Sequence, residues 1–146
     1  MNAALRQALL GCVGADGLLD AAAVAERGAG VFRTDRLQAC ALVRPRCTQE
    51  LSAVMALCHA HRQPVVPQGG LTGLVHGADA AAHELIISTE RMRVIEAIDP
   101  VGRTATVQAG VALARLGEAA QAQGLQYGVD FGARDSATVG GSIATN

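Results

Sequence analysis

The feature that most constrains the fold of this 146-residue chain is a strand, helix and strand pattern over residues 39–66. Apolar runs at 39–43 and 64–66 predict two buried strands, and the segment between them has the periodicity of an amphipathic helix. Two strands joined by a helix form a parallel pair, because the helical crossover returns the chain to the same end of the sheet. The pattern therefore predicts a βαβ unit whose second strand leads directly into a glycine-rich loop.

The predicted helix of this unit begins at Thr48, whose hydroxyl we expect to cap the first turn, and extends to about His61. Glu50 lies in that first turn, where the helix dipole favours a negative charge. Four apolar side chains follow the i, i+3, i+4 and i+7 spacing of one helix face. They are Leu51, Val54, Met55 and Cys58. We expect this face to pack against the sheet.

The rest of the chain predicts a mixed fold in two parts. The expected elements are helices at 2–10 and 18–27, a buried strand at 85–88, hairpin strands at 94–98 and 103–108, and a helix at 111–123 that ends at Gly124. The hairpin turn, Asp99 to Gly102, has the residues of a type I turn. The predicted fold class is α+β, with a βαβ parallel unit followed by an antiparallel hairpin plus helix. We expect two small lobes, with residues 1–38 as an N-terminal helical segment and 39–146 as the main domain.

The loop from Pro64 to Gly77 is where the sequence indicates a bound ligand. Pro67 stiffens the exit from the strand, and the glycines at 69, 70 and 73 let the backbone approach a bulky anion with its N–H groups pointing inward. The chain contains no lysine, which excludes a Walker loop. The sequence therefore predicts a phosphate-binding loop at the C-terminal end of a strand. A tight turn without a ligand is the alternative.

The amino-acid composition limits the classes of binding partner that we expect. The chain has no Trp, one Tyr and two Phe, so it lacks the aromatic surface on which single-stranded nucleic-acid binding relies. Its formal net charge is -1, which indicates neither a nucleic-acid footprint nor a basic membrane face. No apolar run reaches the roughly 18 residues that a spanning helix needs. We therefore expect no nucleic acid and no membrane span.

The cysteines predict reduced thiols and no metal site. Cys12, Cys40, Cys47 and Cys58 lack Cys-x-x-Cys spacing, which is typical of a cytoplasmic protein with unpaired thiols. Cys58 and His61 share a predicted helix face, but two ligands make only half a zinc site and the sequence offers no second pair. We interpret them as a core thiol beside a boundary histidine.

The last segment, residues 127–146, is rich in Gly, Ala, Ser and Thr and poor in core-forming side chains. Small residues with free N–H groups allow a flat ligand to lie against the backbone. A flexible tail is the alternative. Ser136 and Thr138 would act as nucleophiles only beside a base, and the sequence shows no such pair. We expect them to hydrogen-bond a ligand or the local turn.

Two motifs, taken together, resemble a known family. They are Pro67-Gln68-Gly69-Gly70-Leu71-Thr72-Gly73-Leu74 and, further along the chain, Asp130-x-Gly-x-x-x-Ser-Ala-Thr-Val-Gly-Gly-Ser-Ile-Ala-Thr-Asn146. With the hairpin at Asp99-Pro100 and the run from Thr104 to Val111, they resemble the FAD-binding domain of the vanillyl-alcohol oxidase superfamily, the PCMH type. Within that superfamily the chain looks most similar to the branch of D-2-hydroxyglutarate, D-lactate and glycolate dehydrogenases. The resemblance covers residues 39–146.

This resemblance implies that FAD is bound non-covalently between two lobes of a flavin-dependent oxidoreductase. The loop 67–74 would wrap the pyrophosphate, and residues 130–141 would run along the dinucleotide toward the flavin. The implied cofactor-binding residues are Pro67, Gln68, Gly69, Gly70, Leu71, Thr72, Gly73, Leu74, Asp130, Ser136, Thr138, Gly140, Gly141, Ser142 and Asn146. Members of the family transfer a hydride from the α-carbon of a 2-hydroxy acid to flavin N5, while the protein supplies orientation and electrostatics.

The family's pattern continues beyond the position of Asn146 into a substrate domain. The resemblance therefore implies that this chain is an N-terminal fragment, truncated within its FAD-binding domain and inactive in isolation, and that the catalytic residues lie outside it. A homo-oligomer is a further expectation. Two alternatives remain from the residues alone. One is a phosphate- or nucleotide-binding module without redox activity, and the other is an inactive interaction fragment.

Three positions depart from the family's pattern. Leu71 lies where many relatives have Gly or Asn, and we expect a negative φ to accommodate it. Ser142 lies where Gly-Gly-Asn is common. His76 lies where Gly or Ser is frequent, which raises the alternative of a covalent flavin link. We favour a solvent-facing or phosphate-edge side chain for His76.

Overall fold

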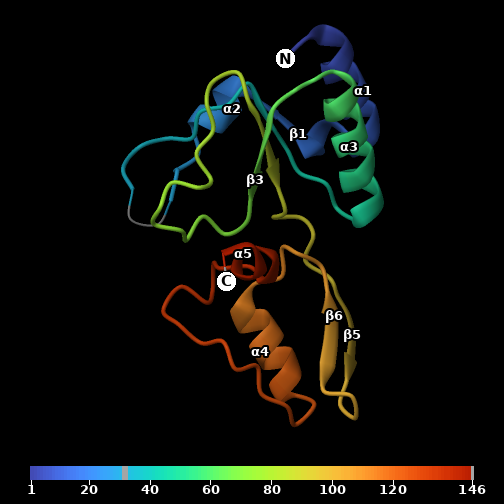
Figure 1. The fold of residues 1–146 in the computed structure, drawn as a ribbon, viewed down its shortest axis with the longest axis vertical. Coiled ribbons are helices and arrows are strands. Elements are labelled where there is room, and N and C mark those ends of the chain that lie inside the picture. The colour runs from blue at the N-terminus through green and yellow to red at the C-terminus, as the bar shows by residue number, and fades with distance from the viewer. Residues whose placement is uncertain (31–32, 146) are drawn as a thin grey trace.

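The chain folds into two lobes, and the computed structural model describes residues 1–30 and 33–145 (Figure 1). The first lobe contains α1 (Ala3–Val13), the short 3-10 helix η1 (Ala15–Gly17), β1 (Leu18–Asp20), α2 (Ala21–Ala25), β2 (Ala41–Val43), α3 (Thr48–Ala60), β3 (Val65–Gln68) and β4 (Leu85–Ser88). The second lobe contains β5 (Ile95–Asp99), β6 (Thr104–Val107), α4 (Leu113–Gln121) and α5 (Val139–Thr145). The predicted α+β fold, a parallel unit followed by a hairpin and helix, is confirmed.

A four-stranded sheet in the order β1-β2-β4-β3 organises the first lobe. β2 and β3 both pair in parallel with β4, and β1 pairs antiparallel with β2 at the edge. The prediction that the strands of residues 39–66 pair with each other is therefore wrong. They are parallel, but β4 lies between them: Val43 and Pro67 are both register partners of Ile87.

Both faces of this sheet are buried, because successive side chains of β2 and β4 alternate between them. The side chains that form the core on the α1 and α3 side are Leu5, Leu9, Val13, Leu18, Ala41, Val43, Val54, Cys58, Leu85 and Ile87. The intervening residues Leu42 and Ile86 belong to the opposite core, with Val24 of α2. Figure 1 shows α1 and α3 together on one side of the strands and α2 on the other.

The predicted helix at residues 18–27 is wrong in its first part. Leu18–Asp20 form β1, and α2 begins only after Asp20. The Asp20 carboxylate accepts a hydrogen bond from the N–H of Ala23 at 2.9 Å, an N-cap that fixes where the helix starts. The chain is extended before this cap because β1 pairs with the exposed edge of β2. A three-residue strand is too short to show a period of its own in the sequence.

Helix α3 is confirmed, but two of its details differ from the prediction. Cys47 occupies the N-cap position without a side-chain hydrogen bond, so Thr48 lies inside the helix and does not cap it. Met55 is 44% exposed and not part of the buried face. That face centres on Val54 and Cys58, which are one turn apart.

The second lobe follows the prediction up to residue 124. The Asp99 carboxylate closes the hairpin turn, since its Oδ1 accepts a hydrogen bond from the N–H of Val101 at 2.9 Å. Gly124 has a φ of 71°, the left-handed conformation expected of a residue that ends a helix. Helix α5 was not predicted, because its sequence contains two glycines and offers no apolar face with a helical period.

The described parts of the chain contain no helix whose length and apolarity would allow it to cross a membrane. All four cysteines are unpaired, as predicted. Cys58 is buried, and the other three are partly exposed. Burial raises the pKa of the Cys12 and Cys58 thiols, which keeps both in the neutral form.

A short set of backbone contacts at residues 89–92 and 108–111 joins the lobes. The N–H of Met92 donates to the carbonyl of Thr89 at 2.8 Å, and the N–H of Gly110 donates to the carbonyl of Met92 at 2.9 Å. A Cβ at Gly110 would lie 1.9 Å from the Thr89 carbonyl oxygen. The second lobe therefore approaches the end of β4 at a point where only glycine fits.

Candidate functional site

The two glycine-rich stretches singled out in the sequence meet where the lobes face each other. A Cβ at Gly70 would lie 1.8 Å from the carbonyl oxygen of Ser136, and one at Gly69 would lie 2.6 Å from Oγ1 of Thr138. These distances leave no room for a side chain at either glycine. The structure thus brings together segments that are more than sixty residues apart in the chain, as a shared binding site requires.

Gln68 fixes both ends of the loop that follows β3. Its side chain is buried, and Nε2 donates a hydrogen bond to the carbonyl of Ala78 at 2.8 Å. Its own carbonyl accepts from the N–H of Thr89. Gln68, predicted to contact a cofactor, therefore has one of its two amide N–H donors engaged within the protein. Pro67 lies before it in β3 and is exposed.

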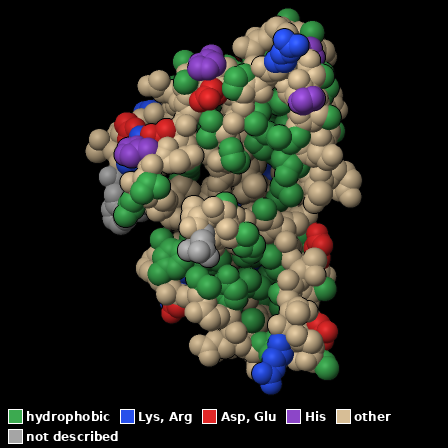
Figure 2. Space-filling view, in the orientation of Figure 1, with side chains coloured by type: hydrophobic (Ala, Val, Ile, Leu, Met, Phe, Trp, Pro, Cys, Tyr) green, Lys and Arg blue, Asp and Glu red, His purple; other side chains and the backbone are tan. Residues whose placement is uncertain are grey.

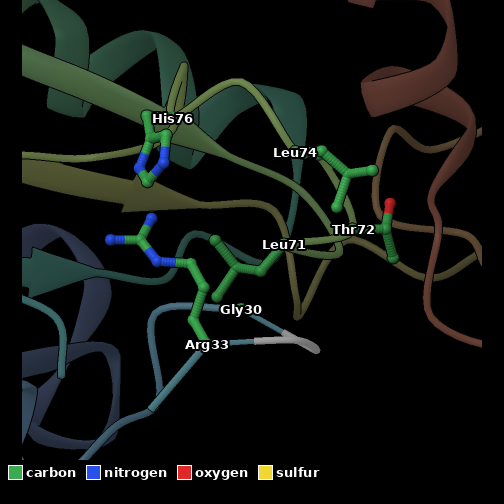
Figure 3. Close-up of a pocket in the computed structure, with 7 residues that line it drawn as sticks. Gly30, Arg33, Leu71, Thr72, Leu74 and His76 are labelled. Carbon is green, nitrogen blue, oxygen red and sulfur yellow. The ribbon is translucent and has the colours of Figure 1, made fainter. Parts of the chain in front are cut away.

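The loop between these fixed points keeps its backbone donors available. Among the hydrogen bonds between described residues, none is donated by a main-chain N–H from residue 70 to 77. The loop also lines a cavity of about 200 Å³ (Figure 3). The lining residues are Gly30, Arg33, Leu71, Thr72, Gly73, Leu74 and His76. A glycine-rich loop with free N–H groups beside a cavity is suited to binding an anion such as a diphosphate.

Two residues of this loop adopt the left-handed conformation without being glycine. Leu71 has a φ of 55° and His76 a φ of 62°. The expectation of a negative φ at Leu71 is therefore wrong. Burial maintains the unfavourable backbone, because the Leu71 side chain packs against the core that contains Val24, Leu37 and Ile86.

Charged side chains hold the outer part of the loop. Arg33 pairs with Asp35 and Asp79, and Nδ1 of His76 lies 2.9 Å from Oδ2 of Asp79. Hydrogen bonds from Arg33 and then from His76 lower the pKa of Asp79, so this carboxylate is ionised at neutral pH. Figure 2 shows basic, acidic and histidine side chains gathered at one edge of the first lobe. The His76 side chain is 65% exposed, which confirms the solvent-facing interpretation.

The second glycine-rich stretch is ordered by its own hydrogen bonds. Oγ1 of Thr138 accepts from the N–H of Gly141 at 3.2 Å, and the N–H of Ser142 donates to the Thr138 carbonyl at 2.9 Å. Gly140 packs on Ala109, where a Cβ would lie 2.7 Å from that side chain. Thr138 thus takes part in the local turn, one of the two roles expected for it.

The remaining predicted residues occupy different surroundings. Asp130 pairs with Arg134 at 2.6 Å and lines an open hollow of about 370 Å³. The residues of this hollow differ from those of the cavity beside the glycine loop. Ser136 is exposed, and Leu74 is largely exposed at the tip of the loop. Asn146 lies outside the described residues.

Sequence reasoning missed Gly30 and Arg33. Both line the cavity, although they belong to the segment that was predicted to be separate from the main domain. No local signal in the sequence reveals them, because Arg33 and Asp79 are 46 residues apart. No group of three His, Cys, Asp or Glu side chains is placed to hold a metal ion in the parts of the chain that the structure describes. The site offers backbone N–H donors and a cavity to an anionic ligand. Among the described residues, none form a catalytic pair there.

Comparison with known sequences identifies a matching family and similar proteins. The family described as FAD binding domain matches residues 39–146. The D-2-hydroxyglutarate dehydrogenase of Xanthomonas citri pv. viticola is 47% identical over 106 residues, which is 73% of this chain and 22% of that protein. The D-lactate dehydrogenase of Anaerostipes hadrus is 41% identical over 105 residues, 72% of this chain and 22% of that protein. The chain therefore spans about a fifth of the length of these curated relatives.

Solved structures share the fold. An alkyldihydroxyacetonephosphate synthase superposes with a TM-score of 0.87 and 21% identity, over 99% of this chain and 32% of the synthase. A p-cresol methylhydroxylase superposes with a TM-score of 0.72 and 19% identity, over 91% of this chain and 27% of the hydroxylase. At this identity the likeness concerns the fold, and it extends over both lobes.

Proposed function

This chain belongs to the FAD-binding domain family, and on that premise we propose that it is the FAD-binding part of a flavin-dependent oxidoreductase acting on a 2-hydroxy acid. The relatives named D-2-hydroxyglutarate and D-lactate dehydrogenase support this substrate class, since both names denote 2-hydroxy acids. The resemblance found in the sequence to this branch is confirmed by these relatives.

The observation that carries the proposal is the meeting of the two glycine-rich stretches beside free backbone donors. Gly69 and Gly70 contact Ser136 and Thr138 across the two lobes. The N–H groups of residues 70–74 donate no hydrogen bond to a described residue, and residues 71–74 line the cavity. Converging N–H dipoles neutralise a diphosphate without a basic side chain. A dinucleotide that contacts both stretches would hold the lobes together.

We assign the predicted residues to three roles. The backbone of residues 70–74 would bind the diphosphate, and Thr72 would add a hydroxyl donor. Gln68 and Thr138 would order the two stretches, because the Gln68 amide donates to the Ala78 carbonyl and the Thr138 hydroxyl oxygen accepts from the N–H of Gly141. Residues 140–142 would approach the flavin side of the dinucleotide.

When bound, FAD would supply the redox chemistry, accepting at N5 the hydride that leaves the α-carbon of the 2-hydroxy acid. This chain would orient the cofactor and supply backbone N–H groups to its diphosphate. We propose non-covalent binding, which predicts that acid precipitation releases the flavin into the supernatant. A cytoplasmic location and a homo-oligomeric state remain predictions.

The test compares two substitutions in the same loop. Gly73 and Gly77 both have open space around the position of a Cβ, so Gly73→Asp and Gly77→Asp are tolerated by the fold. Gly73 lies in the proposed diphosphate contact and Gly77 lies beyond it. We expect Gly73→Asp to weaken FAD binding at least about tenfold, which is ~1.4 kcal/mol, while Gly77→Asp binds like the wild type. Flavin fluorescence quenching measures the affinity.

Equal affinities of the two variants and the wild type would reject the proposed contact. A wild type that is stabilised by ADP and not by FAD would favour the nucleotide-binding module without redox activity. Gly70→Asp is not a suitable substitution for this test. It would separate Gly70 from Ser136 whether or not a ligand is bound, because the Cβ has no room.

A further inference from the structure

The shape of the glycine loop depends on backbone strain at His76. This residue has a φ of 62°, in the left-handed region that side chains other than Gly, Asn and Asp rarely adopt. Such a conformation persists only where the surroundings hold it in place. Burial is not the cause here, because the His76 side chain is 65% exposed. Polar contacts must therefore stabilise it.

Those contacts lead to the N-terminal segment. Nδ1 of His76 lies 2.9 Å from Oδ2 of Asp79, and the His76 carbonyl accepts from the N–H of Asp79 at 3.1 Å. Nη1 of Arg33 donates to Oδ1 of the same carboxylate. Figure 3 shows the side chains of Arg33 and His76 directed toward each other on one side of Leu71. We call Arg33, Asp79 and His76 the loop clamp.

Arg33 is already neutralised in this arrangement. Its Nε donates to Oδ1 of Asp35 at 2.8 Å, its Nη2 donates to Oδ2 of Asp35, and its Nη1 donates to Asp79. One cation therefore faces two carboxylates. A diphosphate close to this group would meet a net negative charge, so the position of Arg33 in the cavity wall does not indicate direct anion binding.

We propose that Arg33 is a positioning residue that acts through the loop clamp. It holds Asp79, which holds His76 in the left-handed conformation, and the loop then presents its N–H groups to the diphosphate. Arg33 itself does not contact the ligand. The inference rests on the proposed function, because FAD is the ligand whose binding reports on the loop.

Arg33→Met tests this role, with Arg36→Met as the matched control. Arg36 belongs to the same segment, is exposed and donates to the carbonyl of Glu26, away from the loop. We expect Arg33→Met to weaken FAD binding about fivefold, the equivalent of ~1 kcal/mol. It should also speed amide hydrogen exchange of Asp79, whose N–H donates to the His76 carbonyl, in the protein without FAD. Arg36→Met should change neither measurement.

A rescue variant separates positioning from direct contact. Glycine adopts a φ of 62° without strain, so His76→Gly removes the need for the loop clamp. We expect the double variant Arg33→Met and His76→Gly to recover FAD affinity to within about twofold of the wild type. If Arg33 touched the diphosphate directly, His76→Gly would not restore the lost contact. Unrescued loss of affinity would therefore overturn the proposal, as would wild-type affinity in Arg33→Met.

If the proposed function is wrong, the wild type itself does not bind FAD, and the affinities of the variants carry no information. The amide exchange measurement needs no ligand, so it still tests the loop clamp in that case. Faster exchange of the Asp79 amide in Arg33→Met than in Arg36→Met would support the loop clamp, and equal exchange would overturn it.

Discussion

At the scale of single residues, the glycines needed for packing differ from those available to a ligand. The sequence indicates Gly69, Gly70 and Gly73 as one phosphate-binding set. In the structure the first two contact Ser136 and Thr138, whereas Gly73 has open space beside it. The sequence alone could not assign these separate roles, because the contact partners lie in a distant segment. The same holds for Leu71, whose left-handed backbone depends on burial against the first-lobe core.

Gly110 and Gly117 offer a direct comparison of two glycine environments. A Cβ at Gly110 would lie 1.9 Å from the carbonyl oxygen of Thr89, whereas Gly117 in α4 has nothing within 4 Å. We expect Gly110→Ala to lower the free energy of unfolding by about 2 to 3 kcal/mol, because the lobe junction must shift. Gly117→Ala should raise it by about 0.5 to 1 kcal/mol through helix propensity. Urea unfolding followed by circular dichroism measures the free energy of unfolding of both variants. Similar values for Gly110→Ala and Gly117→Ala would show that the lobe junction does not require glycine at residue 110.

At the scale of elements, Glu90 connects the end of β4 to Arg27, which follows α2, and to Arg44, which follows the neighbouring strand β2. Its Oε1 accepts from Nη1 of Arg44 at 3.1 Å, and its Oε2 accepts from Arg27 and from Oγ of Ser88. Burial alone would raise the pKa of Glu90, but Arg27 and the hydrogen bonds from Arg44 outweigh it and leave the pKa below its ordinary value. The charged carboxylate therefore stabilises the packing of α2 and β2 against β4.

Glu90→Gln should lower the free energy of unfolding by about 2 kcal/mol at pH 7, since it leaves two arginines without their partner. The pKa of Glu90 is lower in the folded state, so its contribution is present above the ordinary value of 4.5 and is lost as pH falls through the folded-state pKa. The difference between variant and wild type should therefore shrink below that pH. Glu118→Gln, at an exposed position of α4, is the control and should leave the free energy of unfolding at pH 7 close to that of the wild type. If the difference in the free energy of unfolding between Glu90→Gln and the wild type stays the same in acid, the charge of Glu90 does not account for it.

The elements that the sequence predicts well are those with a long, regular pattern. Residues 85–87 form a continuous apolar run because both faces of β4 are buried, and the strand predicted at 85–88 is confirmed. β1 and α5 escaped prediction for opposite reasons. β1 has only three residues and depends on pairing with β2. α5 contains adjacent glycines, whose low helix propensity is overridden by the contacts of Val139 and Gly140 with residues 109–111.

At the scale of the whole molecule, the predicted division at residue 38 falls inside one folded unit. β1 pairs with β2, and α1 shares a core with α3. The segment before residue 38 also supplies Gly30 and Arg33 to the cavity beside the glycine loop. The sequence could not show this, because the contacts join residues far apart in the chain and follow no local period. The two-lobe arrangement itself was predicted from the change from a βαβ pattern to a hairpin pattern.

Gly70→Ala tests whether the glycine contact itself holds the lobes together. The added Cβ would lie 1.8 Å from the Ser136 carbonyl oxygen, so the segment from residue 133 to 141 must move away. We expect faster amide exchange in that segment without ligand, with the core of α3 unchanged and FAD affinity reduced at least about tenfold. Gly73→Ala, where the Cβ meets open space, is the control and should leave exchange unchanged.

Unchanged exchange in Gly70→Ala would mean that the junction at Gly110 alone sets the position of the lobes. Loss of FAD binding together with faster exchange would mean that the cofactor requires two lobes already in contact, and not a glycine loop that closes on the ligand afterwards. That outcome would explain why Gly70 of the first lobe lies so close to the backbone carbonyl of Ser136 in the second lobe. The glycine loop would then be one half of a site whose other half is residues 136–141.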